Sequence, residues 1–139
     1  MKFPALDPNR VTFIPTNSIA NLADIPIFRA PVVGGLVAAR VFTRTAVTGA
    51  NADYIDINLH KLGNTTHSYA AINVIAGVNT TANTWLDLTL DSDYVTWDAA
   101  ETIALTVTFA DEANANIGAA GDNVKYQIDW LPSSYPRGG

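Results

Sequence analysis

Hydrophobic and polar residues alternate with a period of two through most of the chain after residue 35. This alternation predicts β-strands that each bury one face. The clearest case is the segment 54–62 (YIDINLHKL), in which Ile55, Ile57 and Leu59 face one side and polar residues face the other. Turns rich in Gly, Asn, Thr and Asp separate such segments. The predicted strands are 36–45, 54–62, 69–76, 85–90, 94–97, 102–110 and 123–131.

Residues 1–30 show no such alternation. Prolines at positions 4, 8, 15 and 26 interrupt them, and each proline removes a backbone donor and fixes φ. The stretch 16–25 could form one helical turn capped by Asn17 or Ser18. The remainder is predicted to be an extended arm. Because its apolar side chains should not face water, we expect the arm to lie on its own body or on a neighbouring chain.

About eight strands, each with one buried face, favour an all-β fold. We predict an antiparallel eight-stranded jelly-roll-like sandwich with an extended N-terminal arm. The domain organisation predicted is an arm at 1–30, a β-sandwich body at 31–131 and a C-terminal tail at 132–139.

Length and charge restrict the possible functions. The chain has 139 residues, the size of one domain, and no cysteine, so disulfides and thiolate metal sites are excluded. The net charge is −5, with five basic against two acidic residues before position 51 and three against eleven after it. The basic residues form no cluster that could neutralise phosphates, so nucleic-acid binding is disfavoured. No apolar run is long enough to span a membrane. The start of the chain lacks the apolar stretch of a secretory signal, so synthesis in the cytoplasm is expected.

Residues capable of chemistry are few and scattered. His60 is expected on the polar face of its strand and His67 in a turn, both solvated. The carboxylates of Asp91, Asp93 and Glu101, with Asp98, could bind calcium or act as an acid–base pair, but such residues are mostly turn formers. No phosphate-binding glycine motif occurs. We therefore expect no enzymatic activity and no cofactor or metal.

Two tryptophans suggest a binding role. Trp85 falls on the outer face of its strand if the leucines beside it point inward, and Trp97 lies near the acidic turn. Either ring could stack on a sugar. Alternatively, Trp85 covers a subunit contact or the arm, because aromatic residues are enriched in interfaces.

A compact β body with an apolar arm suits packing against copies of itself or against another protein. The sequence suggests a set of contact residues drawn from the arm, the tail and Trp85. These are Phe3, Leu6, Arg10, Val11, Phe13, Ile14, Arg29, Trp85, Tyr135 and Arg137.

The segments 28–63 and 85–109 carry a further signal. They contain a strand of the form Y-I-x-I-x-L and a later step from Val95 to Val107 with alternating apolar residues. In this order of features the chain resembles the small β-sandwich head decoration, or cement, proteins of tailed bacteriophages. It departs from them at Asp98-Ala99-Ala100-Glu101, where many of these proteins have Ala-Gly-Asp.

The resemblance implies a jelly-roll-like body, a homotrimer, and binding to the major capsid protein on the capsid exterior of the virion. It implies no active-site residues. On this basis, the expected role is to stabilise the lattice by clamping neighbouring capsomers. The alternative is a carbohydrate- or receptor-binding module of a phage tail or fibre, with Trp85 or Trp97 beside Asp or Asn groups.

Overall fold

The structure, a computed structural model, describes residues 8–15, 21–44, 46, 55–64, 67–74, 79–93, 95–109 and 124–132. These residues form ten β-strands and no helix. The strands are β1 (Asn9–Phe13), β2 (Leu22–Arg29), β3 (Gly34–Thr43), β4 (Ile55–Lys61), β5 (Ser68–Val74), β6 (Thr84–Asp87), β7 (Thr89–Leu90), β8 (Thr96–Trp97), β9 (Thr102–Phe109) and β10 (Lys125–Pro132).

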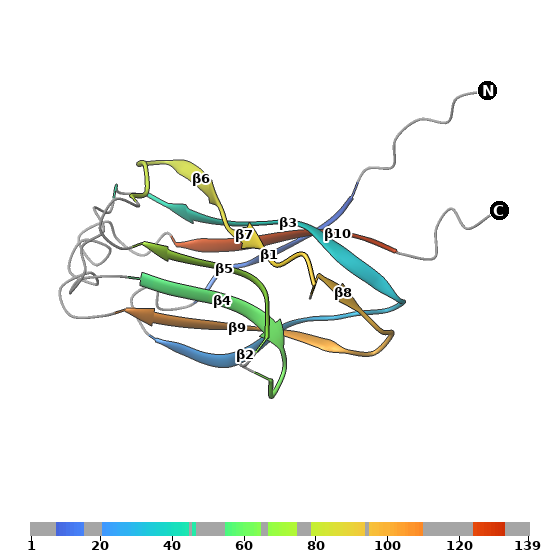
Figure 1. Cartoon of the computed structure of the whole chain (residues 1–139). Coiled ribbons are helices and arrows are strands. Elements are labelled where there is room, and N and C mark those ends of the chain that lie inside the picture. Colours follow the sequence, from blue (N-terminus) through green and yellow to red (C-terminus); the bar gives the residue numbers. More distant parts are fainter. Residues whose placement is uncertain are drawn as a thin grey trace, which may run out of the picture.

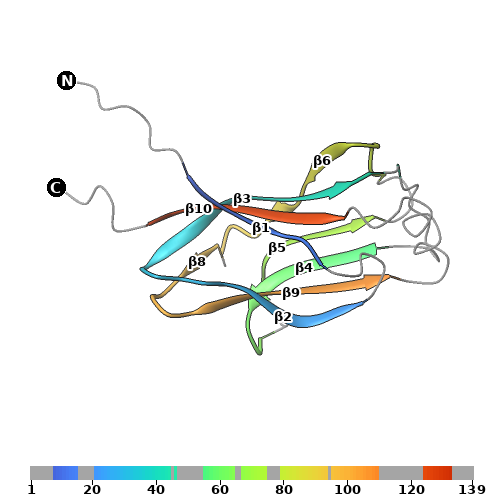
Figure 2. The same cartoon turned by 180° about the vertical axis from the view of Figure 1, so that it is seen from behind.

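The strands form two antiparallel sheets that lie face to face as a sandwich (Figure 1). Sheet A has the order β1-β10-β3-β6, and β8 pairs with the end of β3 beyond β6. Sheet B has the order β2-β9-β4-β5-β7. The view from behind shows β1 and β2 as the edge strands on one side of the sandwich (Figure 2). The prediction of an all-β antiparallel sandwich is therefore confirmed.

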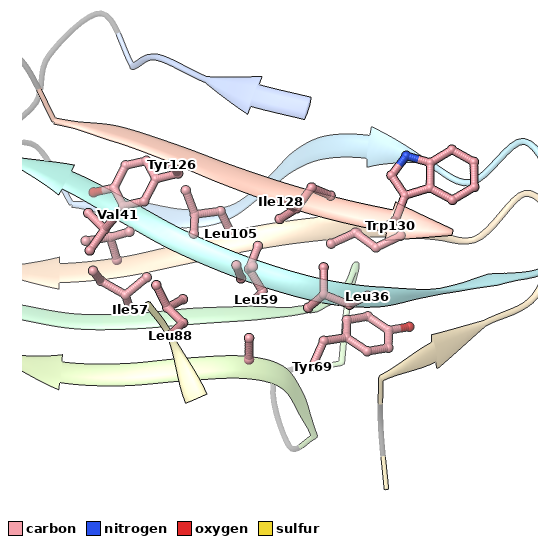
Figure 3. Close-up of a cluster of buried hydrophobic side chains, with 14 of the residues drawn as sticks. Leu36, Val41, Ile57, Leu59, Tyr69, Leu88, Leu105, Tyr126, Ile128 and Trp130 are labelled. Carbon is pink, nitrogen blue, oxygen red and sulfur yellow. The ribbon is translucent and has the colours of Figure 1, made fainter. Parts of the chain in front are cut away.

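The core lies between the sheets and is built from the inward residue of each alternating pair. Ile57 and Leu59 of β4 meet Val41 and Leu36 of β3 across this space (Figure 3). One end of the core is aromatic. There the ring of Trp97 contacts those of Phe28, Tyr69 and Trp130, with centroids 5.7, 5.9 and 6.1 Å away.

One alternating segment joins the two sheets on the side opposite β1 and β2. The strand predicted at 85–90 is divided into β6, which pairs with β3, and β7, which pairs with β5. Leu88 lies between them, buried, and its N–H donates to the carbonyl of Ala39. Leu86 and Leu90 pack against the same core. The segment thus passes from one sheet to the other without changing which side chains face inward.

The prediction that residues 1–30 form an arm separate from the body is wrong for the residues described. β1 pairs with β10 over five residues, and β2 pairs with β9, so both are strands of the sandwich itself. Leu22 to Ile25 are strand, not helical turn. Proline was misleading as a signal because an edge strand tolerates it: Pro26 lies in β2, at the free edge of sheet B.

The other predicted strands agree with β3, β4, β5, β8, β9 and β10 to within a few residues at each end. The seven predicted segments are fewer than the ten described strands, because β1 and β2 were missed and β6 and β7 were joined. The predicted caps Asn17 and Ser18, and the tail after Pro132, lie outside the described residues.

Gly34, the first residue of β3, provides a test of packing at the aromatic end. A Cβ there would lie 2.7 Å from the carbonyl oxygen of Leu131 and 3.2 Å from Nε1 of Trp97. Because a backbone carbonyl cannot move aside, Gly34→Ala should lower the free energy of unfolding by about 2 kcal/mol, measured by urea denaturation. The control is Gly63→Ala, where φ is +81° but nothing lies within 4 Å of the new Cβ, with an expected loss of about 1 kcal/mol. A smaller loss for Gly34→Ala than for the control would contradict the close packing.

Candidate interaction surface

The outer face of sheet A, which we call the sheet A face, carries two rows of side chains fixed by strand register. In the first row, which contains charged residues from all four strands, Arg10 on β1 lies opposite Asp129 on β10, and Arg40 on β3 lies opposite Asp87 on β6 and diagonal to Asp129. In the second row, Lys125, Phe42 and Trp85 lie opposite one another on β10, β3 and β6. Because side chains alternate along each strand, both rows point away from the core.

Asp129 is the centre of the charged row. Arg10 binds it with two hydrogen bonds, Nε to Oδ1 at 2.7 Å and Nη2 to Oδ2 at 3.1 Å. Arg40 Nη1 donates to Oδ2 of the same carboxylate at 2.8 Å, and to Oε1 of Gln127 at 2.9 Å. Gln127 in turn donates to Thr12 Oγ1 at 3.2 Å. The side chain of Asp129 is only 5% exposed although it lies on the outer face, because the two guanidinium groups cover it.

The electrostatics of this row follow from that geometry. The hydrogen bonds from Arg10 lower the pKa of Asp129, against the opposing effect of burial, and Arg40 lowers it further. The same hydrogen bond raises the pKa of Arg10. Asp87 ends the row, 3.7 Å from Nε of Arg40 and largely in solvent. Two positive and two negative groups therefore balance one another across the row.

The second row is aromatic and partly exposed. The rings of Phe42 and Trp85 have centroids 5.2 Å apart, and Lys125 Nζ lies 5.5 Å from the centroid of Phe42. Trp85 is 37% exposed, and Val37, five residues before Phe42 in β3, is 45% exposed. A supported aromatic ring beside arginine is the composition typical of protein contact surfaces.

The second polar cluster is buried on the outer side of sheet B. His60 is 1% exposed, so the prediction that it is solvated is wrong. Its Nδ1 lies 2.9 Å from the carbonyl oxygen of Lys61, and its Nε2 lies 2.8 Å from Thr106 Oγ1. The N–H of Asp24 donates to the same hydroxyl, and the Asp24 carboxylate lies 3.5 Å from Nδ1. These bonds hold β2 to β4 and β9.

A small polar pocket of about 190 Å³ lies at the end of the sandwich that holds the turn between β4 and β5. Lys61 Nζ bonds Glu101 at 2.8 Å, and the hydroxyl of Tyr69 donates to the other Glu101 oxygen at 3.5 Å. Burial acts to raise the pKa of Glu101, but hydrogen bonds from Lys61 and the Asp98 N–H outweigh it and lower that pKa. Burial, with the charge of Glu101, raises the pKa of Tyr69 to about 12. The main polar groups of the pocket therefore already bond one another.

The acidic turn does not assemble a metal site in the part of the chain described. Asp91 instead accepts a hydrogen bond from the N–H of Asp93 at 2.8 Å, as a turn former does. No three His, Asp or Glu side chains among the described residues lie close enough to hold an ion. The same residues include no helix long and apolar enough to cross a membrane.

The predicted contact residues fall into four groups. Arg10 and Trp85 lie on the sheet A face, while Ile14 and Arg29 are exposed at or beyond the ends of β1 and β2. Val11 and Phe13 are half-buried and pack against the core from the edge strand β1. Phe3, Leu6, Tyr135 and Arg137 lie outside the described residues.

Trp97 also requires correction. It is 3% exposed among three aromatic rings, so it cannot stack on a sugar. Conversely, the sheet A face is completed by four residues that were not among the predicted contacts: Phe42, Lys125, Arg40 and Asp129. Their outward alternation was visible, but the strand register that aligns them was not.

Comparison of the chain with protein-family models, with curated proteins and with solved structures finds no match.

Proposed function

We propose that this chain is a non-enzymatic structural protein of a virion, a capsid decoration or cement protein. In this proposal it binds the outer surface of the major capsid protein lattice through the sheet A face and stabilises the lattice by clamping neighbouring capsomers. The observation that carries the proposal is the exposed ring of Trp85, supported by Phe42, beside a charged row that is already paired.

The strand order supports this function. With the two-residue strands β7 and β8 set aside, eight strands remain. Numbered 1 to 8 in chain order, they follow 1-8-3-6 in sheet A and 2-7-4-5 in sheet B. This order supports the jelly-roll-like arrangement that we propose, an architecture that recurs in viral capsid and lectin domains. The fold therefore agrees with the resemblance to phage decoration proteins, and it also agrees with the sugar-binding alternative.

The chemistry of the sheet A face favours a protein as the bound molecule. Its buried carboxylate is held by Arg10 and Arg40, so docking leaves Asp129 paired. A charge that is already bound by its partner is less costly to remove from water than an unpaired one. The exposed aromatic and aliphatic surface of Trp85 and Val37 then supplies apolar area to bury.

The proposed contact differs from the arm first expected. Since β1 and β2 belong to the sheets, residues 9–13 and 22–29 do not extend to the lattice as a free strap. The proposed clamp is instead a face of the folded body.

Trp85→Ala tests this proposal. The variant should bind purified, undecorated capsids of the encoding virus roughly 30-fold more weakly than the unmodified chain, as expected for a central tryptophan of an interface. Cosedimentation with the capsids measures the affinity. The matched control is Leu62→Ala, which removes an apolar side chain of similar exposure, 42%, from the turn after β4. Equal binding by Trp85→Ala and the unmodified chain would assign the contact elsewhere, and no binding by the unmodified chain would refute the function.

The sugar-binding alternative rests on one feature of the same face, the exposed Trp85 ring near the carboxylate of Asp87. The 54° tilt between Phe42 and Trp85 disfavours a flat platform for a long polysaccharide. A glycan array and quenching of tryptophan fluorescence by sugars distinguish the two functions. Saturable sugar binding that Trp85→Ala abolishes, without capsid binding, would favour the alternative.

A further inference from the structure

The edge strands of the sandwich differ in how readily they could pair with a further strand. On the β1 and β2 side, β2 is irregular: its pairing with β9 shifts twice, Pro26 interrupts it, and Asp24 has a left-handed φ of 51°. On the other side, the edges among the described residues are short, with four residues in β6 and two each in β7 and β8. Bulges, proline and short length all discourage strand addition.

β1 is the exception. Its five residues pair with β10 one to one without a shift, and the stretch Asn9–Phe13 contains neither proline nor lysine. Its one charged side chain, Arg10, is bound by Asp129 of its own chain. Among the described residues, no strand pairs with its other side.

We propose that the free edge of β1 pairs with β1 of a second copy of this chain, antiparallel and about a two-fold axis at Val11. The two A sheets then form one continuous sheet. This inference goes beyond the proposed function and does not depend on capsid binding.

The register follows from self-complementarity. With Val11 opposite its own copy, all five residues of β1 find partners, and Arg10 faces the second copy's Thr12. Ile14, 59% exposed, then faces Pro8. A shift that centres the axis on Arg10 would place like charges opposite, and a shift that centres it on Thr12 would pair only three strand residues. The register at Val11 is therefore favoured.

The strength of the association follows from its size. Five strand residues bury less than the roughly 1,200 Å² at which stable interfaces begin. We therefore expect a monomer–dimer equilibrium that depends on protein concentration. Because isologous pairing closes at two copies, it produces no trimer.

Substitutions at Thr12 test both the pairing and its register. Thr12 is exposed, and two Thr12–Arg10 pairs form in each dimer. Thr12→Glu should strengthen dimerisation and Thr12→Lys should weaken it, with about a tenfold difference in dissociation constant between the two variants. Analytical ultracentrifugation measures the constants. Matched controls are Ala23→Glu and Ala23→Lys on the exposed surface of β2, which should leave the equilibrium unchanged.

Hydrogen exchange provides a second readout. Amides of residues 9–13 should become more protected as the protein concentration rises, while those of 22–29 should not. The proposal is overturned by a monomer at every concentration, by a trimer, which the resemblance implies, or by a dimer indifferent to the charge at position 12. A trimer that binds capsids would overturn edge pairing while leaving the proposed function intact.

Discussion

Trp97→Ala is expected to lower the free energy of unfolding by about 4 kcal/mol, the largest effect that we predict for one substitution. The side chain is 3% exposed and lies at the centre of an aromatic cluster formed by Phe28, Tyr69 and Trp130. These rings come from both sheets and cannot all move into the vacated space. The loss therefore combines the transfer of a large apolar group to water with a persistent cavity.

The conservative variant Trp97→Phe separates packing from hydrogen bonding. Nε1 of Trp97 is buried, and no described residue accepts its proton. Phenylalanine keeps most of the ring and removes this unpaired donor, so we expect a loss of about 1.5 kcal/mol. Urea denaturation followed by near-ultraviolet circular dichroism measures both variants. A similar loss for the two would show that the indole N–H, rather than the ring, makes the essential contact.

Asp129→Ala is expected to cost about 3 kcal/mol, the second largest effect. The substitution leaves Arg10 and the partly buried guanidinium of Arg40 without the carboxylate that joins β10 to β1 and β3. The control is Asp87→Ala at the end of the same row. Since that carboxylate is 85% exposed and 3.7 Å from Arg40, its removal should change stability by at most about 0.5 kcal/mol. Equal effects of the two substitutions would contradict the central position of Asp129.

The contribution of Asp129 should also depend on pH. Its pKa is lower in the folded chain than in the unfolded chain, because Arg10 and Arg40 bind the ionised form. As the pH falls, the unfolded chain therefore takes up the proton first. The contribution of Asp129 to the free energy of unfolding is fully present above the ordinary aspartate pKa of about 3.9. It is lost as the pH falls through the lower pKa of the folded state. Asp129→Asn should remove this part of the acid dependence, which urea titrations between neutral and acidic pH measure.

Alternation identified the strands that have one buried and one solvated face. β4 and β9 were predicted almost to the residue, because Ile57 or Val107 and their neighbours repeat every second position. β2 was missed because its alternation is broken at Asp24 and Pro26, where the register shifts. Edge strands tolerate such interruptions, so their sequence pattern is weaker than that of central strands.

The residues of the sheet A face depend on information that one strand does not contain. Arg10 and Asp129 are 119 positions apart, and only the pairing of β1 with β10 brings them together. His60 was predicted correctly to point away from the core. Its burial was not predicted, because Asp24, which lies beside it, comes from another strand. Whether an outward-pointing side chain is exposed to solvent depends on neighbouring loops and strands as well as on the alternation along its own strand.

The segment from β6 to β7 constrains how this protein can change in length. Leu86, Leu88 and Leu90 occupy the core at intervals of two while the backbone transfers from β3 to β5. A one-residue insertion or deletion between them would reverse the orientation of every side chain beyond it and turn leucines toward water. A two-residue change would preserve orientation and alter only the reach between the layers. Related or designed chains should therefore vary this segment in even steps.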